Sequence, residues 1–164
     1  MKIFQNFFLF FGRLFLSIIF ILSAINKVLH WQATERCLVA LLCDWHSYLS
    51  NNLFFQKIFT FLLPWVPAIL VVITAIELLG GLLVFFGLKV RFGAFLLICF
   101  LLPATVMLHH FWFVEEGKKE IEMVLFLKNI AILGGLFYLL AIGKKGGYEK
   151  KIASLDNPTI TDEQ

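Results

Sequence analysis

Four runs of apolar residues, each about as long as a bilayer is thick, constrain this chain more than any other feature of its sequence. They cover residues 7–25, 67–87, 92–111 and 121–142. A helix needs ~20 mostly apolar residues to cross the hydrocarbon core, and only helices and closed barrels satisfy every backbone polar group there. The sequence therefore predicts an all-α fold, an integral membrane four-helix bundle.

The composition agrees with a membrane protein and excludes other classes. Of the 164 residues, 60% are hydrophobic and only 15% are charged. A soluble domain of this length has too little interior to bury so much apolar surface. The net charge of +3 is small and the basic residues form no stripe, which argues against a nucleic acid partner. The expected partner is the lipid bilayer.

The basic residues near the span ends predict the orientation. Lys89 and Arg91 lie in the short link between the second and third spans, and Lys144 and Lys145 follow the fourth. Because Lys and Arg collect on the cytoplasmic side, we expect both chain ends in the cytoplasm. We divide the chain into a membrane domain over residues 1–147 and a polar cytoplasmic tail over residues 148–164.

A long segment, residues 26–66, separates the first two spans. Its middle mixes apolar and charged residues, which is typical of an amphipathic segment on a membrane surface. Loops of this length without structure of their own are uncommon. We therefore expect a long amphipathic extracytoplasmic loop between the first and second membrane helices.

All four Trp and all four His fall on this same predicted side. An interfacial aromatic belt explains the Trp, whereas the His also raise the alternative of a metal site or a proton relay. No two His are four residues apart, and the adjacent His109 and His110 point apart. We therefore assign no metal site, and keep His109, His110, Trp112, Asn26 and Lys27 as candidates at the outer face.

The three cysteines indicate no redox centre within the chain, because there is no Cys-x-x-Cys motif. Cys37 and Cys43 are six residues apart, so a disulfide between them requires a stretch that is not helical. Cys99 lies inside an apolar run and is expected to be a small buried hydrophobe.

Glu77 is the most informative residue, because it lies near the middle of the second span. An unpaired acid at that depth costs ~2.5–3.5 kcal/mol on insertion scales. It therefore needs a proton, a wet cavity or a cation. The two cations at comparable depth are Arg13 and Lys128, with Asn129 beside the latter. We expect these four residues to form an intramembrane polar network, which is either a ligand site or a purely structural contact between helices.

Two glycine pairs support close helix packing around this network. Gly80 and Gly81 follow Glu77 on the same helix face, and Gly134 and Gly135 occupy a similar place in the fourth span. Small residues let membrane helices approach closely, so all four are predicted packing positions.

These features together resemble the DoxX family of small four-helix bacterial membrane proteins. The resemblance extends from about residue 13 to residue 143. Its carriers are Arg13, Ser23–Lys27, Glu77–Leu83, Gly87–Ala94, Ala104–Thr105, His109–Trp112 and Phe126–Gly135.

The resemblance implies a function in the bacterial inner membrane, because the family takes its name from a subunit of a thiosulfate:quinone oxidoreductase. It points to a membrane subunit of a quinone- or thiol/sulfur-linked redox complex, with oxidoreductase subunits as partners. The sequence has no flavin, haem or iron–sulfur motif, so we assign no catalytic residue and no cofactor held by the chain alone, and leave quinone open as a bound cofactor. A proton-linked or small-solute carrier, which we expect to need a homodimer, and an assembly protein without its own chemistry remain as alternatives.

Overall fold

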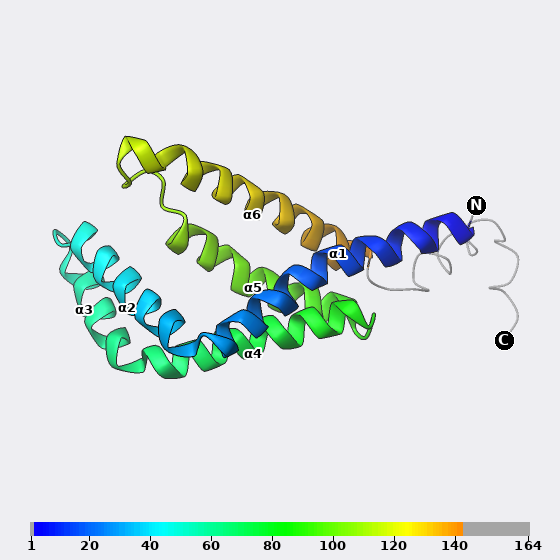
Figure 1. Cartoon of the computed structure of the whole chain (residues 1–164), viewed down its shortest axis with the longest axis horizontal. Helices are drawn as coiled ribbons and strands as arrows, with labels where there is room; N and C mark the ends of the chain where they lie inside the picture. Colours follow the sequence, from blue (N-terminus) through cyan, green and yellow to red (C-terminus); the bar gives the residue numbers. More distant parts are fainter. Residues whose placement is uncertain (1, 143–164) are drawn as a thin grey trace, which may run out of the picture.

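The computed structural model describes residues 2–142, and every regular element within them is a helix (Figure 1). The predicted tail, residues 148–164, lies outside the described residues. The helices are α1 (Lys2–Leu29), α2 (Trp31–Tyr48), α3 (Leu53–Leu62), the short 3-10 helix η1 (Leu63–Trp65), α4 (Val66–Phe85), α5 (Val90–Leu108) and α6 (Glu116–Ile142).

Four of these helical stretches are long and apolar enough to cross a membrane, which confirms the predicted all-α membrane bundle. They are Phe7–Leu29, Leu53–Phe85, Val90–Leu108 and Glu116–Ile142. The second is 33 residues long, or about 50 Å if straight, and exceeds the ~30 Å hydrocarbon core. It is divided at η1, where Pro64 and Pro67 each remove a backbone N–H donor.

The segment between the first two spans is a helical hairpin, α2–α3. A single residue, His30, separates α1 from α2, and residues 49–52 form the turn between α2 and α3. Asn52 caps α3 by accepting a hydrogen bond from the Phe54 N–H at 3.0 Å. Figure 1 shows the hairpin at the same end as the α5–α6 connection, which we call the hairpin end. The α4–α5 turn lies at the opposite end, which we call the turn end.

The helices pack in a chain of neighbours, with α1 against α4, α4 against α5, and α5 against α6. The contact between α1 and α6 is much smaller, and Gly135 of α6 faces Leu16 of α1 there. The largest buried cluster joins these helices, and it comprises Phe20, Val84, Val90, Ala94, Leu97, Ile98, Leu101, Leu133, Leu136 and Leu139.

Glycines allow a close approach between α4 and α5. A Cβ on Gly80 would lie 2.9 Å from Leu97 and 3.2 Å from the Gly93 carbonyl oxygen. A Cβ on Gly93 would lie 3.0 Å from the Gly80 carbonyl oxygen. Gly81 faces Ile21 of α1 in the same way. Three of the four expected packing glycines therefore contact another helix.

The fourth, Gly134, differs from the expectation. It is exposed, and a Cβ there would meet nothing within 4 Å. Adjacent residues on a helix point about 100° apart, so with Gly135 turned toward α1, Gly134 cannot face the same neighbour.

The cysteines also depart from one expectation. Cys37 and Cys43 both lie on α2 as free thiols, which agrees with the requirement that a disulfide needs a stretch without helix. Cys99 was expected to be buried, but it lies on the exposed side of α5. A thiol is apolar enough to face lipid, so periodicity within a uniformly apolar span does not reveal its direction.

Candidate functional site

A buried ion pair joins α1 and α4 in the middle of the bundle. Lys27 Nζ lies 2.7 Å from Glu77 Oε2. The Glu77 side chain is only 2% exposed, and that of Lys27 is 20% exposed. Glu77 is thus buried and paired with a cation, as its cost in hydrocarbon demands.

Two further groups complete the surroundings of the Lys27 ammonium. Its Nζ donates to Ser23 Oγ at 2.7 Å, and it lies 5.5 Å from the centroid of the Phe100 ring. An ammonium has three N–H donors. Glu77 and Ser23 take two of them, so one donor stays free of any acceptor among the described residues, beside an aromatic ring.

The direction of side chains on α1 explains why Lys27 reaches so deep. A helical Cα–Cβ bond tilts toward the helix N-terminus, so the Lys27 stem runs back over Ser23, four residues earlier. Gly81 of α4 packs against Ile21 of α1. This packing places Glu77, four residues before Gly81, at the level of the Lys27 ammonium.

The structure corrects the expected partners of Glu77. Among residues 2–142, Glu77 makes no ion pair with Arg13 or Lys128. The Arg13 guanidinium lies against Gly87 at the turn end, and its Nε donates to the Leu9 carbonyl at 3.3 Å. Lys128 is exposed on the outside of α6. Depth alone suggested both residues, but Arg13 contacts the residue that follows the end of α4 and not Glu77, and Lys128 is exposed.

The remaining buried polar side chains do not extend the pair into a chain of hydrogen bonds. Thr74 and Thr105 each donate to the carbonyl four residues earlier on their own helix, at 2.7 and 2.6 Å. Ser17 donates to the Leu14 carbonyl. Asn129 is buried as expected, at 9% exposure, but no hydrogen bond joins it to Glu77 among the described residues. The pair is therefore compact.

Sequence reasoning missed Ser23 and Phe100, and placed Lys27 at the outer face rather than in the network. The Ser23–Lys27 spacing of four residues was the available signal for this contact on one helix face. Phe100 had no signal, because nothing distinguishes it from the other 19 Phe in the chain.

A second group of polar and aromatic residues lies at the hairpin end. Trp45 Nε1 on α2 donates to the Met107 carbonyl oxygen on α5 at 3.0 Å. The Tyr48 ring stacks on that of Phe113, with centroids 4.7 Å apart and planes at 12°. The His110 ring lies against both Trp45 and Tyr48. These contacts attach the α2–α3 hairpin to the α5–α6 connection.

The other expected outer-face residues lie near this second group. His109 Nδ1 is 2.8 Å from Glu122 Oε2 on α6. Trp112 packs against Phe111 and Phe126. Asn26 is exposed and contributes only its carbonyl, which lies 3.2 Å from His30 Nδ1. In the described part of the chain, no three His, Cys, Asp or Glu side chains gather as a metal site would require.

Of three comparisons with known proteins, one finds a match. A family model described as DoxX matches residues 8–110, which is more than half of the chain and includes Lys27, Glu77 and Phe100. No curated protein and no solved structure matches the sequence.

Proposed function

The chain belongs to the DoxX family, and from this premise we propose that it is the membrane subunit of a quinone- or thiol-linked redox complex. In this proposal the Lys27–Glu77 pair receives the polar headgroup of a quinone, and the electrons come from a partner oxidoreductase subunit. Family membership and four membrane-spanning helices support a multi-pass membrane protein. The redox assignment is our inference from the family resemblance together with the site.

The free third donor of Lys27 is the observation that carries the proposal. A headgroup with carbonyl oxygens needs a hydrogen-bond donor set in apolar walls, and Lys27 Nζ beside Phe100 provides both. A bound quinone supplies two-electron, two-proton redox chemistry. For this chemistry Lys27 Nζ would hold a carbonyl oxygen by a charge-assisted hydrogen bond, and the Glu77 carboxylate would keep the ammonium in place by accepting from it at Oε2.

The test is quinone retention during purification of the full chain in mild detergent. We expect quinone in the wild-type protein and its loss in Glu77→Gln and Lys27→Met. The matched control is Lys128→Gln, which removes an exposed cation from α6 and should retain quinone. The double variant Lys27→Met/Glu77→Met restores an uncharged, packed centre, so quinone lost from it reflects the missing donor and not misfolding. A wild-type protein that never retains quinone and copurifies with no oxidoreductase refutes the proposal.

A proton-linked carrier is the second candidate, favoured by the ionisable pair at mid-depth in the membrane. It predicts solute uptake into proteoliposomes that Glu77→Gln abolishes. If Glu77→Gln folds and retains both quinone and uptake, the pair only holds α1 against α4, which is the assembly alternative.

We further propose that the protein lies in the bacterial inner membrane with the hairpin end outside. The charges at the turn end support this orientation, since Arg13, Lys89 and Arg91 gather there and Arg91 donates to the Ala141 carbonyl at 2.6 Å. We expect a membrane-impermeant thiol reagent to label Cys37 and Cys43 on intact cells, where both are exposed on α2. The Cys37→Ser/Cys43→Ser variant is the control, because the remaining Cys99 lies within a membrane span. Labelling seen only after lysis reverses the orientation.

A further inference from the structure

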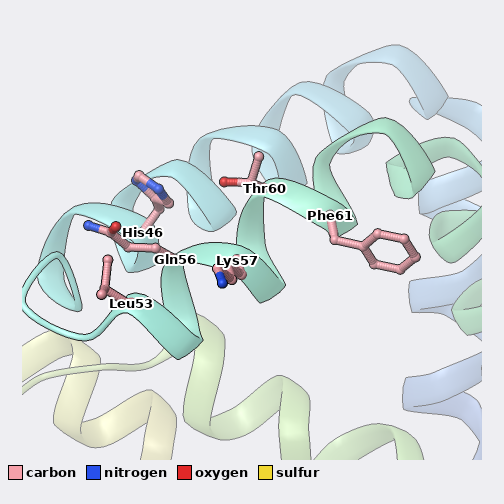
Figure 2. Close-up of a pocket in the computed structure, with 6 residues that line it drawn as sticks. All are labelled: His46, Leu53, Gln56, Lys57, Thr60 and Phe61. Atoms are coloured by element: carbon pink, nitrogen blue, oxygen red, sulfur yellow. The ribbon is translucent and has the colours of Figure 1, made fainter.

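A groove on the α2–α3 hairpin has a lining that the proposed function does not use. Figure 2 shows His46 of α2 facing a row of side chains from α3. The row is Leu53, Gln56, Lys57, Thr60 and Phe61. This spacing of three and four residues keeps all five on one face of α3. The groove is wide open to its surroundings and has a volume of about 460 Å³.

The polar part of the lining offers hydrogen-bond donors and one positive charge. Lys57 contributes an ammonium, Thr60 a hydroxyl and His46 a ring nitrogen, while Gln56 Nε2 already donates to the Ser50 carbonyl at 2.6 Å. No Asp or Glu lines the groove. Within residues 2–142, Lys57 makes no ion pair. This charge pattern is complementary to an anion.

The apolar part of the lining indicates which class of anion the groove binds. Leu53 and Phe61 are 73% and 66% exposed, and Phe54 beside them is exposed as well. The helix that carries them belongs to an apolar stretch that continues into the membrane span α4. A free phosphate ion gains nothing from such surfaces, whereas a phospholipid buries its acyl chain against them.

We propose that this groove binds an anionic phospholipid, with the phosphate at Lys57, Thr60 and His46 and an acyl chain along Leu53 and Phe61. Lys57 carries most of the selectivity for a negative headgroup, because it is the one fully charged member of the lining. The bound lipid then lies beside the hairpin at the membrane surface and stabilises the packing of α3 on α2.

The test uses the full chain in nanodiscs of phosphatidylcholine with one fifth phosphatidylglycerol. After extraction in mild detergent, native mass spectrometry counts the phosphatidylglycerol retained per protein. We expect Lys57→Gln to reduce retention about fivefold, the loss for one basic residue at an anionic surface. Lys57→Arg should restore it. The matched control is Lys118→Gln, another lysine at the hairpin end, which should change nothing.

Three outcomes overturn the proposal. Equal losses in Lys57→Gln and Lys118→Gln indicate only general attraction to the membrane surface. Competition by millimolar inorganic phosphate, without any effect of Phe61→Ser, indicates a free anion site. Unchanged retention in Lys57→Gln, together with protection of the groove by a copurifying protein, identifies a protein-docking surface instead.

Discussion

The middle of the bundle and the hairpin end solve the same problem, polar side chains at a membrane, in opposite ways. In the middle, one cation and one carboxylate depend on each other, and Ser23 is their only other hydrogen-bond partner among residues 2–142. At the hairpin end, the Trp45 hydrogen bond and the stacked Tyr48 and Phe113 rings hold α2 against α5 and the α5–α6 connection. The His109–Glu122 contact holds that connection against α6. The first arrangement has no redundancy, and the second has several parallel contacts of modest strength.

The largest effect should come from leaving one member of the central pair alone. We expect Lys27→Met to lower the free energy of unfolding by ~3–5 kcal/mol, because Glu77 is then buried without compensation. Glu77→Ala should cost more than Glu77→Gln, which keeps volume and hydrogen-bonding capacity. Unfolding in mixed micelles measures these values.

The double variant Lys27→Met/Glu77→Met serves as the control for this first prediction. It should recover most of the loss, since well-packed apolar replacements of buried pairs are often neutral. If Lys27→Met alone is as stable as wild type, Glu77 has another partner and the contrast between the two regions disappears.

A smaller effect should follow from widening the α4–α5 contact. Gly93→Ala places a Cβ about 3 Å from the Gly80 carbonyl and from Leu83, and overpacking of this kind costs ~1–3 kcal/mol. Gly134→Ala meets open space and should not destabilise the bundle. Equal effects of the two substitutions on unfolding in mixed micelles would contradict the assigned packing.

The smallest effect should come from the hairpin end, where contacts are redundant. Trp45→Phe removes the hydrogen bond to the Met107 carbonyl and keeps most of the aromatic surface, so the expected loss is ~0.5–1.5 kcal/mol. Adding Tyr48→Leu should cost more than the sum of the two single losses, because each contact compensates for the other. Simple additivity in this double-mutant cycle would show that the contacts are independent.

The sequence was sufficient for the spans and for the burial of Glu77, because hydropathy and the cost of a buried charge do not depend on the arrangement of the helices. It was insufficient for the partner of Glu77, which depends on which helix faces α4. Lys128 and Asn129 illustrate the difficulty. They differ by one position, and only Asn129 faces inward.

The hairpin was only partly predictable for a related reason. Amphipathic character over residues 34–53 indicated a surface segment, but the apolar residues of α3 merge with the following span in any hydropathy profile. Backbone geometry at Pro64 and Pro67 separates α3 from α4, and this is a property of local dihedral angles and not of solvent transfer.

The compactness of the Lys27–Glu77 pair has a practical consequence for spectroscopy. Glu77 is the one ionisable side chain in the described residues that is fully buried, and the buried Thr74 and Thr105 each donate to a carbonyl of their own helix. In infrared difference spectra, a carboxylate band from a dry environment should therefore come from the Glu77 side chain. The Glu77 carboxyl group is thus a label-free spectroscopic reporter. The spectrum of the Glu77→Gln variant, which lacks this group, is the control.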